Sequence, residues 1–150
     1  MHCLQPINCN NRALRHLKKF ESLQSEAELL LTDFQEKLQS NSSDVRFRLK
    51  LHASQREMFR AFSRKDILEA VTNGWVIEMN ERSNNKIIIV MYFIHTGPKS
   101  YRPIHLVCVL NSPFDWEVIT VYDPRSRSWW WGNNYSERIC WCAEQLEEEY

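Results

Sequence analysis

The sequence contains very little glycine, with three residues among 150. A phosphate-cradling Walker loop and a GxGxxG dinucleotide-binding turn both need closely spaced glycines, and neither pattern occurs. The GxSxG turn that presents a nucleophilic serine is missing as well. The familiar nucleotide-binding and serine-hydrolase motifs are therefore excluded.

An excess of charge of either sign is also missing. Nineteen Lys and Arg residues balance nineteen Asp and Glu residues, so no overall field draws the chain to nucleic acid or to a membrane surface. The balance is uneven along the chain, because residues 128–150 carry one basic and five acidic side chains. Only a local basic patch can therefore attract a polyanion, and the sequence ends in an acidic tail.

No apolar run approaches the ~20 residues of a membrane span. The longest run, Ile87–Ile94, has the length and the β-branched composition of a strand. Basic residues interrupt the N-terminal segment and leave no apolar stretch for a signal peptide. These residues are Arg12, Arg15, Lys18 and Lys19. We expect a cytoplasmic protein with no membrane contact.

The cysteines are few and irregularly spaced. There are five of them, Cys3, Cys9, Cys108, Cys140 and Cys142. An odd number without an export signal favours reduced thiols over a disulfide framework. Neither Cys3-x5-Cys9 nor Cys140-x-Cys142 has the paired CxxC spacing of a structural zinc site, and no histidine cluster lies beside them. The sequence therefore predicts no metal site and no cofactor.

The first fifth of the chain has the pattern of one long helix. Leu and Phe recur at spacings near three and four over residues 11–39, without Gly or Pro. Asn10 or Asn11 is the expected N-cap, and the polar run at 40–44 ends the helix. This helix either packs on the main domain or binds a partner, which includes a second copy of the chain.

Two further helices are predicted before the pattern changes. One covers about 50–61. The other has a well-defined start and end, because Ser63 can cap its N-terminus, Asp66 completes a capping box, and Gly74 follows its last turn.

Strands follow these helices. The strand segments are Trp75–Met79 leading to Lys86–His95, Ile104–Leu110 and Glu117–Tyr122. The connections between them are too short for parallel crossovers, so neighbouring strands are expected to be antiparallel. The predicted fold class is α+β, with N-terminal helices packed on an antiparallel sheet of about four strands. The expected organisation is a helical extension at 1–45, the α+β domain at 46–131, and an acidic C-terminal tail at 132–150 that forms a short helix or a mobile end.

A polar stripe on the predicted second helix has the parts of a phosphodiester site. His52, Arg56 and Arg60 are successive i, i+4 neighbours. Cleavage of a phosphodiester needs a group that moves a proton and fixed positive charge where negative charge develops. The alternative is an exposed helix face that is basic by chance.

A second candidate group lies in the strand after Arg102. His105 interrupts an apolar strand, so it must either find a hydrogen-bond partner or face the open side of the sheet. The alternating positions of this strand form the more apolar face, which we expect to pack on the helices. These positions are Ile104, Leu106, Cys108 and Leu110. A single strand histidine is also a common structural residue.

A third group of candidates lies at and after the last predicted strand. Tyr122 ends this strand and can donate a hydrogen bond to phosphate or act as an amphipathic strand end. Arg125 and Arg127 then precede three consecutive tryptophans. The two arginines are candidates for binding the RNA backbone, and Trp129 and Trp130 are candidates for stacking on RNA bases. We expect at least one of the three to be exposed. The competing interpretation is an apolar lid over the sheet or a protein-binding patch.

The order of five sequence blocks resembles the DUF4258 family. The blocks are His52-Ala53-x-x-Arg56-x-x-x-Arg60-x-x-Ser63, Asn73-Gly74, Val76-Ile77-Glu78, Arg102-Pro103-Ile104-His105 and Ile119–Pro124. The resemblance extends from about Leu51 to Trp129, and Ala61-Phe62 stands where the family usually has Gly-Ile. Residues 1–45, the tryptophan triplet and the acidic tail lie outside it.

The resemblance implies a fold and an activity. The family is grouped with the small toxins of the barnase/colicin/RelE-like (BECR) superfamily, in which helices pack on a four-stranded antiparallel sheet. It implies a metal-independent ribonuclease, such as the toxin of a toxin–antitoxin or interbacterial system, in which the RNA 2′-OH attacks the adjacent phosphate. His52 or His105 would then move the proton, and Tyr122 would orient the phosphate or protonate the leaving oxygen. The residues implied to hold the phosphate are Arg56, Arg60 and Arg102.

The implied partners are an RNA substrate and an antitoxin or immunity protein. Two other functions remain open, because family membership does not guarantee catalysis. One is an inactive protein-interaction module, which the neutral charge balance favours. The other is a regulator that binds RNA without cutting it.

Overall fold

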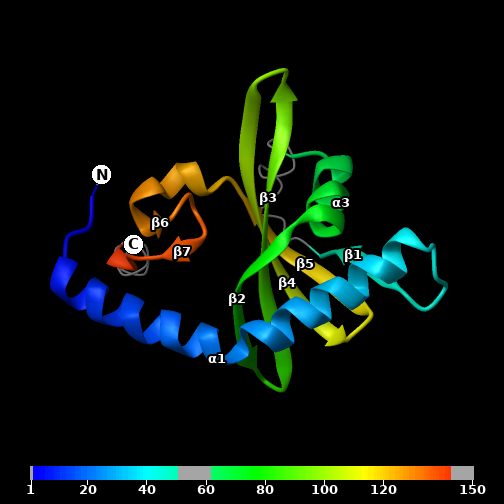
Figure 1. Ribbon diagram of the computed structural model, residues 1–150, viewed down its shortest axis with the longest axis horizontal. Coiled ribbons are helices and arrows are strands. Elements are labelled where there is room, and N and C mark those ends of the chain that lie inside the picture. The colour runs from blue at the N-terminus through cyan, green and yellow to red at the C-terminus, as the bar shows by residue number, and fades with distance from the viewer. Residues whose placement is uncertain (1, 51–61, 143–150) are drawn as a thin grey trace.

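The computed structural model describes residues 2–50 and 62–142 (Figure 1). A long N-terminal helix and a short second helix accompany a sheet, and a small hairpin follows near the C-terminus. In chain order the elements are α1 (Pro6–Gln39), β1 (Arg46–Leu49), α3 (Arg64–Asn73), β2 (Trp75–Arg82), β3 (Asn85–Gly97), β4 (Ser100–Ser112), β5 (Asp115–Tyr122), the 3₁₀ helix η2 (Pro124–Trp130), β6 (Trp131–Gly132) and β7 (Glu137–Arg138).

The main sheet has five strands in the order β1-β5-β4-β3-β2. The strands β2 to β5 form the predicted antiparallel meander. β1 adds a fifth strand, parallel to β5, at the edge of the sheet. The α+β class predicted from the sequence is confirmed, with one strand more than expected. In Figure 1, α3 and the C-terminal half of α1 lie to one side of the sheet, and η2 with the β6–β7 hairpin lies to the other.

The main core lies between the helices and one face of the sheet. From α1 it receives Ala27, Leu31 and Phe34, whose spacing places them on one helix face. Phe34 stacks on Trp116 of β5 with their ring centroids 4.5 Å apart. The β4 residues expected to face the helices all lie in this core, which confirms that prediction: Ile104, Leu106, Cys108 and Leu110.

The start and end of α3 match the sequence prediction closely. The Ser63 hydroxyl accepts a hydrogen bond from the Asp66 N–H, and the Asp66 carboxylate accepts one from the Ser63 N–H, each at 3.1 Å. This reciprocal pair is the capping box.

Gly74 follows the helix at the point where α3 meets β3. A Cβ atom there would lie 2.4 Å from the Ala70 carbonyl oxygen and 2.6 Å from the Met91 carbonyl oxygen. The close approach of two backbones therefore requires glycine at this position.

Three local predictions differ from the structure. α1 begins at Pro6 rather than at Asn11, because proline is well suited to the first helical turn, where its missing N–H is not needed. β1 was not predicted, since four residues give a weak pattern and their parallel partner is distant in sequence. In the expected tail, residues 132–138 form turns and a hairpin rather than a helix.

Some predictions lie outside the described residues. These are the helix at about 50–61 and residues 143–150 of the acidic tail. Among the helices that the structure describes, none combines the length and the apolar character that a membrane span requires.

Candidate functional site

His105 and Tyr122 lie side by side on the sheet face opposite the helices. The two residues occupy paired positions of β4 and β5, so their side chains project to the same face. The Tyr122 hydroxyl lies 3.2 Å from Nδ1 of His105. Trp131 is the first residue of the β6–β7 hairpin, and its ring covers His105 edge-on with the ring centroids 4.4 Å apart. The histidine is completely buried as a result.

Both ring nitrogens of His105 have hydrogen-bond partners within the protein. Nε2 lies 2.9 Å from the carbonyl oxygen of Tyr135. A carbonyl only accepts, so Nε2 carries the hydrogen, and Nδ1 then accepts from the Tyr122 hydroxyl. Burial lowers the pKa of His105 to about 4, although the Tyr135 carbonyl and the charge of Asp123 oppose this shift. His105 is therefore a neutral residue that orients the Tyr122 hydroxyl.

Asp123 connects Arg102, which the family resemblance implies holds the phosphate, with Arg125, a predicted RNA-binding residue. Its carboxylate lies 2.9 Å from Nε of Arg102 and 2.8 Å from Nη2 of Arg125. Burial raises the pKa of the Asp123 carboxyl, but the hydrogen bonds from Arg125 and Arg102 outweigh it and lower the pKa overall. Two guanidinium groups and one carboxylate leave a net positive charge. Arg125 is about half exposed, with 49% of its side-chain surface accessible.

The candidate site residues that the structure describes lie near one end of β4 and β5, but on opposite faces of the sheet. Arg102 lies three residues from His105, so strand alternation directs the two side chains to opposite faces. The Arg102 guanidinium lies 4.2 Å from the ring centroid of Phe62, which belongs to the core on the helix side. His105 packs on the other face under Trp131. Tyr122 and Asp123 are consecutive and link the two groups around the strand end.

The stacking residues predicted after Arg125 are largely occupied by contacts within the protein. Trp129 and Trp130 are half-buried and Trp131 is buried, so the expectation that at least one of the three is exposed was wrong. Trp131 is a lid over the sheet, and Trp129 and Trp130 pack against the cysteines near the chain ends. The Trp130 ring also contacts two guanidinium groups, Arg127 at 4.5 Å and Arg138 at 3.8 Å. These contacts match the lid interpretation more closely than an open stacking surface.

The predicted stripe of His52, Arg56 and Arg60 lies outside the described residues. The two described ends of that segment both reach the sheet. The Lys50 N–H donates to the Val118 carbonyl oxygen at 2.9 Å, and Phe62 packs on Arg102.

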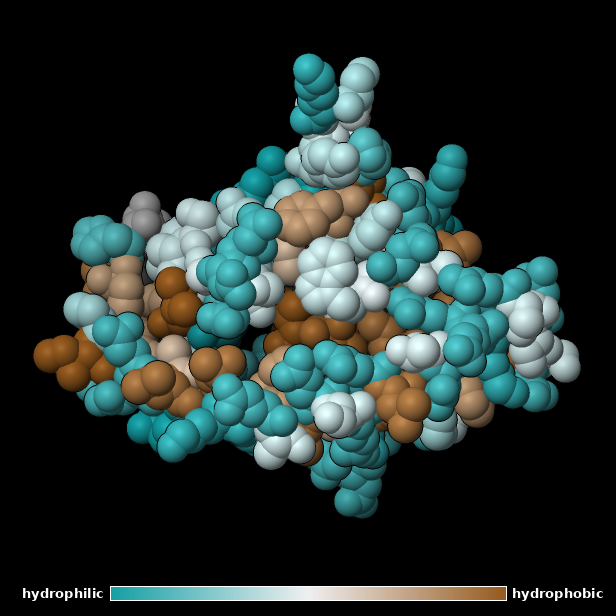
Figure 2. Space-filling model, in the orientation of Figure 1, coloured by the Kyte–Doolittle hydropathy of each residue, from teal (hydrophilic) through white to brown (hydrophobic). Residues whose placement is uncertain are grey.

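A groove of about 560 Å³ lies between α1, the start of β2 and the β6–β7 hairpin. Figure 2 shows this hollow beside α1, with apolar side chains at its rim. Its larger apolar lining residues include Leu14, Leu17, Phe20, Trp75, Ile77 and Ile139. None of the described site candidates lines the groove, so it is separate from the His105 cluster.

Four cysteines form a second cluster, which the sequence analysis did not anticipate. Cys3, Cys9, Cys140 and Cys142 are far apart in sequence, and their sulfur atoms all lie within 4.8 Å of one another. The spacing within each pair is not the usual zinc spacing, so only the folded chain reveals this group. Cysteine sulfurs in such a set are potential metal ligands.

The fold and the described site define an α+β domain with a polar cluster at the end of its central strands. A family model with the description "Domain of unknown function (DUF4258)" matches residues 49–123, which is half of the chain. The chain therefore belongs to the DUF4258 family. Searches of curated proteins and of solved structures found no match. The matched region contains Arg102, His105, Tyr122 and Asp123 but none of the four clustered cysteines.

Proposed function

We propose that the chain is a metal-independent endoribonuclease of the toxin type, related to the BECR superfamily, that cleaves RNA through attack of the 2′-OH on the adjacent phosphate. The observation that carries this proposal is the meeting of Arg102, Tyr122 and Arg125 around Asp123 and His105 at one end of the sheet. Membership of DUF4258 supports it, because this cluster lies almost entirely within the matched residues.

Each residue of this cluster has a separate role in the proposed cleavage reaction. The net positive charge around Asp123 suits a phosphate, with the half-exposed Arg125 as the accessible guanidinium. His105 holds the Tyr122 hydroxyl in place in the free protein, and when RNA binds, the single hydroxyl hydrogen turns from Nδ1 of His105 to the phosphate or the leaving oxygen. Because both nitrogens of His105 are already bonded, we assign proton abstraction to His52 and a positioning role to His105.

The first test measures cleavage of a structured RNA by the purified full chain in buffer without added divalent cations. The expected product carries a 2′,3′-cyclic phosphate, since attack by the 2′-OH forms that ring. His52→Ala and Tyr122→Phe should each lower the rate by about 100-fold or more. His95→Ala is the matched control, because His95 is an exposed histidine of β3 whose ring packs against Tyr101 rather than against His105, Tyr122 or Asp123. Wild-type cleavage no faster than that of both site variants would overturn the proposal.

A second test addresses the proposed toxin role and its partner. Induced expression in a bacterial host should arrest growth, and Tyr122→Phe should relieve the arrest at equal protein level. A protein that binds the chain and restores growth would be the antitoxin or immunity partner. If the wild-type protein cleaves RNA but does not arrest growth, the toxin role is contradicted. The proposed ribonuclease activity is not affected by that result.

The burial of His105 favours a second candidate function. A histidine with a pKa of about 4 and no open nitrogen does not exchange protons with a substrate near pH 7. On this alternative the chain is an inactive member of the fold that binds RNA or a protein. Binding of RNA without cleavage, with an affinity that falls steeply as salt rises, would support the RNA-binding form. Absence of both binding and cleavage would favour the protein-interaction form.

A further inference from the structure

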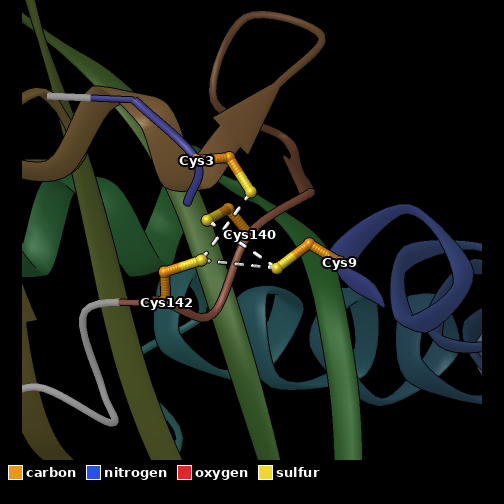
Figure 3. Close-up of side chains that lie close together, drawn as sticks. All are labelled: Cys3, Cys9, Cys140 and Cys142. Carbon is orange, nitrogen blue, oxygen red and sulfur yellow. Dashed lines mark hydrogen bonds between the residues drawn. The ribbon is translucent and has the colours of Figure 1, made fainter. Parts of the chain in front are cut away.

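The four clustered cysteines come from both ends of the described chain (Figure 3). Cys3 precedes α1 and Cys9 lies in its second turn, whereas Cys140 and Cys142 follow β7. Three of the four are buried, and Cys3 is half-buried. The side chains point toward a common centre in Figure 3. Cys108 lies apart, in the core of the main sheet.

The distances between the sulfur atoms match a tetrahedral metal site. The pairs Cys3–Cys142 and Cys9–Cys142 are both separated by 3.7 Å, and Cys9–Cys140 by 3.9 Å. At a Zn–S distance of about 2.3 Å, a tetrahedron places its sulfur atoms about 3.8 Å apart. A disulfide would instead bring two sulfurs to about 2.05 Å. The four sulfurs are thus spaced as ligands of one central ion.

Backbone groups hydrogen-bond three of the four sulfur atoms. The backbone of Leu4 contacts Cys142, that of Trp141 contacts Cys9, and that of Cys142 contacts Cys140. Cys9 also lies near the N-terminus of α1, where the helix dipole favours negative charge.

Positive charge lies beside the cluster. Four thiolates around one divalent ion leave an excess of negative charge, which nearby cations compensate. Arg12 and Arg15 line the same surface depression as Cys9 and Cys142. Arg138 donates a hydrogen bond to the carbonyl oxygen of Cys140.

The packing around the cluster gives a reason for a metal. The apolar group that joins the chain ends consists of the four cysteines with Trp129 and Trp130. So few buried side chains make a weak core, and small lobes of this kind usually need a metal or a disulfide. A bound ion would join the first turns of α1 to the segment after β7, across sequence separations of 131 to 139 residues.

From this geometry we infer that Cys3, Cys9, Cys140 and Cys142 bind one Zn²⁺ ion in a closed structural site. Four sulfur ligands leave no position open for water or substrate, so the ion stabilises the fold and does not take part in the cleavage step. Tetrahedral sulfur sites hold zinc or iron, and the mutual distances exclude a polynuclear cluster, whose thiolates bind different iron atoms and lie farther apart. The inference does not depend on RNA cleavage.

The test is the metal content of the full chain, measured by plasma mass spectrometry after purification without chelators. We expect about one zinc ion per chain. Cys3→Ser and Cys142→Ser should lose the zinc, and Cys108→Ala, which removes the fifth cysteine, should retain it. Iron in place of zinc would overturn the assignment of the metal.

A second measurement uses the wild-type protein alone and does not depend on whether a variant folds. A mercurial reagent added to native protein should release zinc in proportion to the thiols that it titrates, as a coloured zinc indicator reports. Replacement of the zinc by Co²⁺ should give the intense visible absorption of a tetrahedral thiolate complex. Wild-type protein that carries no zinc, takes up neither ion, or contains disulfides among these cysteines would overturn the inference.

Discussion

The Tyr122 hydroxyl donates its hydrogen bond to Nδ1 of His105 from the directly paired position on the neighbouring strand. A buried histidine and a partly buried tyrosine thus form one unit, which the Tyr135 carbonyl completes from the hairpin. The unit connects the central strands of the sheet to the β6–β7 hairpin. Its contribution to stability can be measured separately from any activity.

We expect His105→Ala to lower the free energy of unfolding by about 3 kcal/mol. The change empties a fully buried site and removes the hydrogen bonds that His105 makes with the Tyr122 hydroxyl and the Tyr135 carbonyl. Urea unfolding followed by circular dichroism measures the loss. His95→Ala, at an exposed position, should change stability by less than about 0.5 kcal/mol. Equal effects of the two variants would contradict the structural role of His105.

Stability should fall on mild acidification because of the same histidine. Burial lowers its pKa from 6.5 to about 4, so between these values the unfolded chain binds a proton that the folded chain does not. The contribution of neutral His105 to the free energy of unfolding is fully present above the unfolded pKa. It decreases as the pH falls below that value, and the loss reaches about 2 kcal/mol near pH 5. Urea titrations at several pH values measure this loss. The variant His105→Gln should lack this component, so parallel pH profiles for the variant and the wild type would contradict the prediction.

Gly74→Ala should destabilise the fold by about 3 kcal/mol, since an added methyl group collides with two carbonyl oxygens. The backbone angle φ of Gly74 is −79°, which any residue adopts, so the effect is purely steric. Gly97→Ala is the matched control, because the nearest atoms to its new Cβ lie 3.8 Å away. Thermal or urea unfolding of both variants tests the difference. A tolerated alanine at position 74 would show that α3 does not pack against β3 as closely as described.

Asp123→Asn should strengthen RNA binding if the proposed phosphate site is correct. The amide retains an oxygen to accept the Arg125 N–H, but it removes the negative charge that competes with phosphate for Arg102 and Arg125. The salt dependence of binding should become steeper by about one phosphate contact. Fluorescence anisotropy with a labelled RNA at several salt concentrations measures both quantities. Asp44→Asn, at an exposed surface pair, is the control, and an equal change in both variants would count against the site.

Local sequence signals predicted the local parts of the fold well. The capping box at Ser63 and the glycine at the end of α3 depend on residues within a few positions of one another, and both were predicted correctly. The alternation in β4 likewise indicated which face packs on the helices. β1 was not predicted because its parallel pairing with β5 joins residues separated by most of the domain.

Tertiary contacts determine the parts of the site that the sequence did not reveal. Arg102 packs on Phe62 and His105 lies under Trp131, and both of these partners come from other segments of the chain. The tryptophan triplet gave no indication that Trp131 covers His105. The cysteine cluster depends on two pairs of residues that meet because the start of α1 lies beside the segment after β7.

The distance along the chain between the two cysteine pairs has a consequence for biosynthesis. Cys3 and Cys9 leave the ribosome more than a hundred residues before Cys140 and Cys142. Cys3 and Cys9 must therefore stay reduced until all the strands of the main sheet have been translated. A polypeptide that terminates early keeps two unmatched thiols at its start, which distinguishes it chemically from a chain that has reached position 142.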